Sequence, residues 1–262
     1  MRFLAADGRV KTKVSRPTGE SPVHASIVGG NVDIFRWLLR DLHHPYNVCA
    51  VNPTLENERI TLSLLGVASL LGRKEMVEFL LSYTDIDVIL GETSPLALAC
   101  QNNHIECVRL LVEKGHAPAS SELLYAAIEK SEVEIAKILL SDPKVDVAAV
   151  VEQFSPFIIA CEMGFDGLVA MMLQRPVEFD LNHARTSETQ PFTGFEFACL
   201  RGQIAIVLAL LKHEKFVVPW RHDSPGGLSF AMLKGHLTII EELNLKFAWS
   251  RICCPVLAWK GP

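Results

Sequence analysis

The stretch SPLALACQNNHIECVRLLVEKGHAP, residues 94–118, carries the pattern from which the fold of this chain can be predicted. It opens with Ser-Pro, continues through small and apolar residues to a polar Asn-Asn-His turn, and then runs into a second apolar stretch. A hydroxyl side chain accepts hydrogen bonds from the free N–H groups at a helix start, and proline fits the first helical position. The stretch therefore predicts two short helices joined by a tight turn.

The same two-helix pattern occurs seven times along the chain, with starts near Ser21, Ser63, Ser94, Glu122, Ser155, Thr193 and Gly226. Successive starts lie 42, 31, 28, 33, 38 and 33 residues apart. A period of this length predicts an all-α repeat solenoid, a stack in which each repeat packs only on its neighbours. We expect a single repeat domain over residues 1–262, with a partial repeat at residues 1–17. Residues 245–262 are expected to be a C-terminal cap or a docking tail.

The residue that ends each first helix is also of a restricted type. Glycine is expected there in a left-handed conformation, which it adopts without strain. It occupies this place in five repeats, at Gly30, Gly72, Gly164, Gly202 and Gly235, and Asn103 and Ser131 occupy it in the other two. His104 and His236 come directly after this place and are predicted to make structural hydrogen bonds.

Composition excludes several classes of function. The net charge of −5 gives no electrostatic reason to expect nucleic acid as a partner. No apolar run reaches the roughly 18–20 residues of a membrane-spanning helix, and the N-terminus lacks the apolar stretch of a signal peptide. Cysteine recurs at one repeat position, at Cys100, Cys161 and Cys199, which indicates small buried thiols. We expect a reduced cytoplasmic protein, with the nucleus as the other compartment.

No pattern in the chain points to catalysis. The glycine-rich phosphate-binding motifs and the G-x-S-x-G nucleophile motif are missing. His43, His44 and Cys49 lie close together, but a structural zinc site needs four ligands and no fourth is nearby. We therefore predict a chain without catalytic residues, cofactor or metal, which is not an enzyme.

Two repeats carry extra residues between their second helix and the next repeat. Residues 40–59, RDLHHPYNVCAVNPTLENER, are predicted to form an elongated finger. Residues 174–191, QRPVEFDLNHARTSETQP, are predicted to form a polar loop. Insertions of this kind often shape a binding surface in repeat proteins. They are equally compatible with neutral variation of surface loops.

The repeats resemble ankyrin repeats, whose consensus runs T-P-L-H-x-A-A-x-x-G-H, followed by a second helix ending in Leu-Leu and a β-hairpin finger. Residues 21–39 and 94–118 are the clearest matches, and the resemblance covers about residues 18–245. The consensus histidine survives only as His24, and the finger sequence is eroded. The resemblance therefore implies an ankyrin-type stack with weakened hydrogen bonds between repeats.

The same resemblance implies a surface that binds proteins. Ankyrin arrays typically bind on a concave face made by the finger tips and by two variable residues before each closing glycine. Phe154 and Phe192 stand at equivalent places before Ser155 and Thr193. With variable residues of the same repeats they are expected to form one patch; the predicted partner-binding residues are Phe154, Glu162, Met163, Phe192, Leu200 and Arg201. The alternative is that both rings pack under the 174–191 loop and meet no partner.

These patterns predict a non-catalytic protein-interaction module, an adaptor, scaffold or stoichiometric inhibitor, that acts as a monomer on one or more protein partners. One alternative is a regulatory or targeting part of a larger multidomain protein or enzyme. Another is a substrate of asparagine hydroxylation, for which the resemblance implies Asn182.

Overall fold

The computed structural model describes residues 22–41, 45–47, 49–51, 61–91, 93–151, 154–175, 181, 192–218 and 226–247. The chain divides into two compact units, residues 1–123 and residues 124–262. We call them unit 1 and unit 2. The division falls inside helix α8 (Ser121–Glu129), most of which belongs to unit 2.

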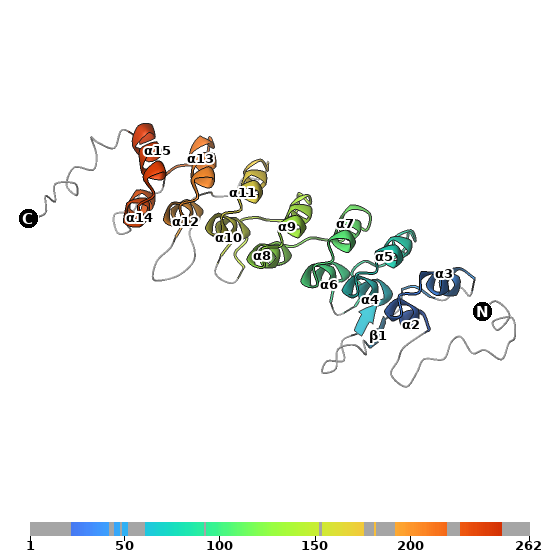
Figure 1. The fold of residues 1–262 in the computed structure, drawn as a ribbon. Helices are drawn as coiled ribbons and strands as arrows, with labels where there is room; N and C mark the ends of the chain where they lie inside the picture. The colour runs from blue at the N-terminus through green and yellow to red at the C-terminus, as the bar shows by residue number, and fades with distance from the viewer. Residues whose placement is uncertain are drawn as a thin grey trace, which may run out of the picture. The chain divides into compact units, whose positions relative to one another are not determined.

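Unit 1 consists of helix pairs joined by tight turns. Its helices are α2 (Pro22–Val28), α3 (Val32–Arg40), α4 (Leu64–Leu70), α5 (Lys74–Leu80), α6 (Pro95–Gln101) and α7 (Ile105–Glu113). The first helices α2, α4 and α6 pack in sequence, and so do the second helices α3, α5 and α7 (Figure 1). Each first helix also packs on its own second helix. The core lies between these two rows.

The two strands in the described part of the chain lie in the elongated finger and directly after it. Strands β1 (Cys49–Val51) and β2 (Thr61–Ser63) are antiparallel, with Cys49 opposite Ser63 and Val51 opposite Thr61. Strand β2 leads directly into α4, and Leu62 also bridges to Gly91 of the following finger.

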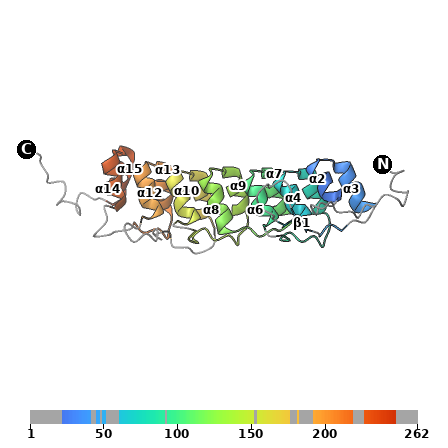
Figure 2. The ribbon, with the colours of Figure 1, turned by 90° about the horizontal axis from the view of Figure 1, so that it is seen from below.

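Unit 2 repeats the arrangement with α9 (Val133–Leu140), α10 (Pro156–Met163), α11 (Asp166–Leu173), α12 (Gly194–Arg201), α13 (Ile204–Lys212), α14 (Gly226–Lys234) and α15 (Leu237–Phe247). Helices α10, α12 and α14 form one row, and α9, α11, α13 and α15 form the other (Figures 1 and 2). The fold class is therefore the all-α repeat solenoid that the sequence predicts.

Hydroxyl caps start four of the first helices, as predicted. In each, the side-chain oxygen accepts a hydrogen bond from the N–H three residues on; the caps are Ser63, Ser94, Ser155 and Thr193, at 3.0, 3.1, 3.3 and 3.2 Å. Ser21 lies outside the described residues. Helix α8 starts at Ser121, one residue before the expected Glu122, and the Ser120 hydroxyl accepts from the N–H of Leu123.

At three of the turns that close a first helix, a side chain of the next repeat makes a hydrogen bond that joins the two repeats. His104 Nε2 lies 3.0 Å from the carbonyl oxygen of Leu70, and His236 Nε2 lies 3.2 Å from that of Leu200. Both histidines therefore have the structural role predicted for them. In the first turn of unit 1, Arg73 serves instead and donates to the carbonyl of Val28 at 3.1 Å. These bonds link neighbouring repeats at the turns between their helices.

Substituting Gly72 by alanine is expected to destabilise the chain by about 1–3 kcal/mol. Gly72 has φ +64°, and an added Cβ would lie 2.6 Å from His104 Nδ1, so the change strains the backbone and displaces the histidine. Equilibrium urea unfolding measures the effect. Gly167→Ala is the matched control, because Gly167 is helical and nothing lies within 4 Å of its added Cβ. The control should be neutral or stabilising by up to about 1 kcal/mol; equal losses in both variants would contradict the role of His104.

Candidate functional site

Four phenylalanine rings form a continuous row through three successive repeats of unit 2. Phe154 precedes α10, Phe192 precedes α12, Phe197 lies within α12 and Phe230 lies within α14. The rings of Phe154 and Phe192 both contact Phe197, with centroids 5.9 and 5.3 Å apart, and Phe192 also contacts Phe230 at 5.2 Å. We call these four residues the aromatic row. Tilted ring contacts at such separations are the favourable geometry for aromatic pairs.

The row divides into a buried part and a part that reaches the surface. Phe197 and Phe230 are buried, whereas Phe154 and Phe192 are half-buried. The two rings predicted to bind a partner therefore also stabilise the stack. Removing them would disturb the fold as well as any binding, so a binding test needs other residues.

The remaining predicted residues lie at the other end of the first helices. Arg201, the last residue of α12, donates to Glu162 near the end of α10 at 2.8 Å, with side-chain exposures of 56% and 22%. Met163 is 43% exposed. Leu200 is half-buried, and its carbonyl holds His236. This exposed ion pair contributes little to stability. Glu162 engages one of the five N–H donors of Arg201, so the other donors are available for further contacts.

The six predicted residues are therefore arranged as two clusters in the structure. Phe192 precedes the first residue of α12 and Arg201 ends it, and a helix of this length spans about 12 Å. One cluster contains the two half-buried rings, and the other contains Glu162, Met163, Leu200 and Arg201. Phe197, which links the rings, was not among the predicted residues. Its equivalence with Phe230, 33 residues later at the same place of the repeat, is a signal that could have identified it.

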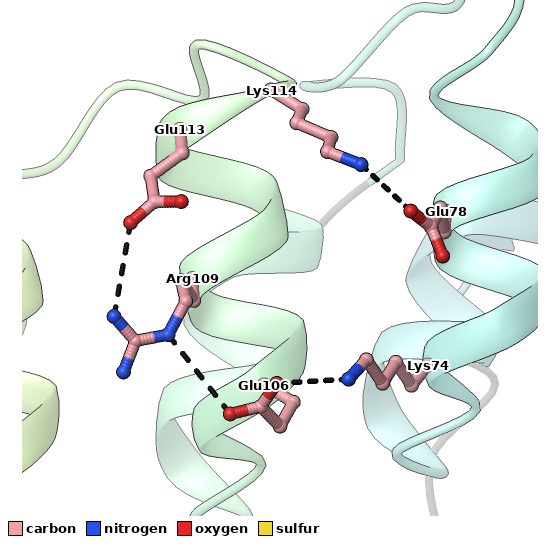
Figure 3. A network of polar contacts seen from close by, with 6 residues as sticks. All are labelled: Lys74, Glu78, Glu106, Arg109, Glu113 and Lys114. Atoms are coloured by element: carbon pink, nitrogen blue, oxygen red, sulfur yellow. Dashed lines mark hydrogen bonds and ion pairs between the residues drawn. The ribbon is translucent and has the colours of Figure 1, made fainter.

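Unit 1 carries a network of charged side chains on its second helices, shown in Figure 3. Lys74 of α5 pairs with Glu106 of α7 at 3.0 Å, and Glu78 of α5 pairs with Lys114, which follows α7, at 2.7 Å. Arg109 lies 3.9 Å from Glu106 and 3.8 Å from Glu113 along the same helix.

Each cation of this network has an acidic partner. The hydrogen bond between Lys74 and Glu106 raises the pKa of the lysine and lowers the pKa of the carboxyl, and Lys114 lowers the pKa of Glu78 in the same way. Three cations face three carboxylates, so the network offers no excess charge to a ligand. We interpret it as a link between neighbouring repeats and not as a binding site.

An aromatic cluster fixes the base of the elongated finger. Tyr46 stacks on Tyr83 with centroids 4.4 Å apart, and Tyr83 meets Phe79 edge to face at 5.7 Å. The guanidinium carbon of Arg40 lies 4.8 Å from the centre of the Phe79 ring. The Tyr46 hydroxyl donates to Asp85, which raises the pKa of the tyrosine. These contacts hold the finger against the end of α5.

No group of three or more metal-ligating side chains occurs among the residues that the structure describes. His43 and His44, which the sequence brings close to Cys49, lie outside those residues. Asn182 lies outside them as well.

The buried cysteines are expected to resist alkylation in the folded protein. Burial raises the pKa of Cys107 from 9.0 to about 11 and raises the pKa of Cys161 and Cys199 further. Because the thiolate is the reactive form, and each pKa unit changes its population tenfold, Cys107 should react about 100-fold more slowly at pH 8 than an unshifted thiol. Its rate should rise with pH until about pH 11.

Mass spectrometry after a short iodoacetamide pulse locates the modified cysteines. The same pulse in denaturant is the control, in which the buried cysteines Cys100, Cys107, Cys161 and Cys199 should all react. Rapid labelling of Cys161 in the folded chain would contradict the burial described here.

The structure belongs to the class of repeat proteins that consist of stacked helix pairs joined by loops. Comparison with known proteins shows which repeat it resembles. Residues 85–150 match the family model described as ankyrin repeats (3 copies). The solved ankyrin repeat domain of Bcl-3, a member of the IκB protein family, has a TM-score of 0.62 and 19% identity, over 85% of this chain and 99% of that one. The ankyrin repeat domain of human ASB11 has a TM-score of 0.56 and 20% identity, over 84% and 98%. The chain therefore has the fold of ankyrin repeat domains, and its residues 85–150 match ankyrin repeats in sequence.

Among curated proteins, the chain is similar to the phosphate system positive regulatory protein PHO81 of Saccharomyces cerevisiae. The two are 32% identical over 130 residues, which make up 48% of this chain and 10% of PHO81. The match thus spans about a tenth of that protein's length. Separately, no helix in the described part of the chain is long and apolar enough to cross a membrane.

Proposed function

We propose that this chain is a non-catalytic protein-interaction module, an adaptor, scaffold or inhibitor, that binds a protein partner through unit 2. Ankyrin repeat domains generally act in this way. The observation that supports the location is the surface at the ends of α10 and α12, where Met163 and Arg201 are exposed beside half-buried Leu200. Methionine and arginine are both enriched at the cores of protein interfaces.

The aromatic row supports this location because it holds together the helices that carry the proposed surface. Its contacts run from Phe154, two residues before α10, to Phe230 in the middle of α14, so they fix three neighbouring first helices relative to one another. A preorganised surface loses less conformational entropy on binding than a mobile one. The proposed face therefore combines exposed contact residues with a rigid base.

Replacing Met163 by aspartate is expected to reduce partner binding at least about tenfold, because a charge replaces an apolar contact at the interface. The measurement is affinity capture from a lysate of the native cell, followed by titration of the captured protein. Ile89→Asp is the matched control, since Ile89 is an exposed apolar residue in unit 1. Both variants should melt at the temperature of the wild type.

Loss of the partner from the Met163 variant alone would support the proposal. Equal retention by both variants would contradict the location in unit 2. Turnover by the isolated chain would contradict the non-catalytic role.

A second candidate is a regulatory or targeting part of a larger protein or enzyme. The observation that favours it is the match to PHO81, in which the matched repeats are a small part of a long regulatory protein. Denaturing gel electrophoresis of the native cell extract, followed by immunoblotting with an antibody against residues 94–118, distinguishes the two. A polypeptide far larger than 29.0 kDa on a denaturing gel would support this second candidate.

A further inference from the structure

The first helices α12 and α14 both end in a leucine, a basic residue and a glycine. Leu200-Arg201-Gly202 ends one and Leu233-Lys234-Gly235 ends the other, 33 residues later. The two helices pack against each other, and His236 of the second turn binds the carbonyl of Leu200 in the first. The two leucine–cation pairs therefore stand side by side on neighbouring repeats.

The second pair is exposed to an unusual degree. Leu233 is 76% exposed and the preceding Met232 is 43% exposed, while Lys234 is exposed at the end of its helix. Within the described residues Lys234 has no ion-pair partner. Exposed apolar side chains beside an unpaired cation do not stabilise the fold. They are typical of a surface that binds another protein.

The positive charge here exceeds the negative charge. Arg201 has one acidic partner, Glu162, which engages one of its five N–H donors. With Lys234, the two helix ends carry two cations against one carboxylate. The helix dipole also stabilises cations near a helix C-terminus. However, the positions of unit 1 that correspond to Arg201 and Lys234 hold the uncharged residues Gly29, Leu71 and Asn102. The helix dipole alone therefore does not account for the pattern, nor does it account for the exposure of Leu233.

The spacing of the two cations fits an extended peptide. Packed helices lie about 8–10 Å apart, and an extended chain in the polyproline II conformation rises about 3.1 Å per residue and turns every third side chain to the same face. A segment that crosses from α12 to α14 therefore brings residues about three positions apart over Arg201 and Lys234. Side chains on an adjacent face of such a segment would lie beside the exposed Leu233 and Met232.

We propose that the ends of α12 and α14 bind an extended acidic segment of the partner protein, with two carboxylates about three residues apart and apolar side chains beside them. This rests on the proposed function and specifies the chemistry of the partner. Arg201 binds one of the two carboxylates while it keeps its contact with Glu162, and Lys234 binds the other. Met232 and Leu233 supply the apolar contact. The surface selects acidic segments because a basic one would leave two cations facing like charge.

Selection from a library of random 12-residue peptides on the full chain tests the assignment. The wild type is compared with Arg201→Glu/Lys234→Glu and with Lys137→Glu/Lys212→Glu, in which the same number of charges is reversed on the second helices α9 and α13. The wild type and the control should enrich peptides with two acidic residues about three positions apart among apolar ones. An enriched peptide, made synthetically, should lose at least about tenfold in affinity on the Arg201/Lys234 variant and change little on the control.

Enrichment of peptides without acidic residues would overturn the inference, as would an acidic peptide that binds the Arg201/Lys234 variant as tightly as the wild type. Failure of the wild type to enrich any peptide would overturn it too. None of these results affects the Met163 comparison, so the proposed function stands or fails separately. Thermal melting of each variant establishes that the charge reversals leave the fold intact.

Discussion

Phe197→Ala is expected to lower the free energy of unfolding by about 3–5 kcal/mol, the usual cost of truncating a buried phenylalanine. The ring is buried in α12 and is the one that contacts both Phe154 and Phe192. Its removal leaves a cavity and breaks the aromatic row between α10 and α14. Equilibrium urea unfolding, followed by circular dichroism, measures the loss.

Two variants separate this explanation from a general sensitivity of the core. Phe197→Leu preserves most of the volume and should cost less than about 1.5 kcal/mol. Phe154→Ala removes a half-buried ring at the edge of the row and should cost clearly less than Phe197→Ala. If Phe154→Ala and Phe197→Ala proved equally destabilising, Phe197 would not be the central ring of the row.

Thr193→Val is expected to destabilise the chain by about 2–4 kcal/mol, which is more than an ordinary helix cap contributes. The Thr193 hydroxyl accepts from the N–H of Glu196 at 3.2 Å. In return, the Glu196 carboxylate accepts from the Thr193 N–H at 2.8 Å and from its hydroxyl at 3.1 Å. Both residues are fully buried. Valine keeps the shape but leaves a buried N–H and a carboxyl oxygen each without one of its bonds.

The matched comparison is Ser94→Ala, which removes the same kind of cap where it is only partly buried and should cost about 1 kcal/mol. Glu196→Gln should stay within about 1 kcal/mol of the wild type, because its carbonyl oxygen can accept the same bonds. Thermal and urea unfolding report both differences. A Thr193→Val loss no larger than that of Ser94→Ala would show that the reciprocal bond contributes nothing beyond an ordinary cap.

The local elements could be predicted from sequence because each depends on a few neighbouring residues. Hydroxyl caps, left-handed closing residues and the inter-repeat histidines follow from the repeat pattern itself. Asn103 and Ser131, which replace glycine, have φ of 56° and 62°, so the expected conformation is present without glycine. The prediction that residues 1–262 form a single domain stays a prediction.

The contacts of the predicted site residues are harder to predict from sequence, because they depend on how neighbouring repeats are positioned. Sequence reasoning selected Phe154 and Phe192 by their equivalent places, but their contact with Phe197 requires the finger of one repeat to lie over the helix of the next. Pairing of Arg201 with Glu162 likewise joins residues that are 39 positions apart. The capping role of Glu196 was missed for a different reason: it replaces the consensus histidine and was seen only as a departure from the family pattern.

Hydrogen–deuterium exchange of the chain, alone and saturated with its captured partner, tests most directly whether the ends of α10 and α12 bind protein. Binding is expected to slow exchange in residues 160–164 and 198–203, and to leave the second helices α11 and α13 unchanged. Protection confined to α11 and α13, or to unit 1, would contradict the proposed binding face.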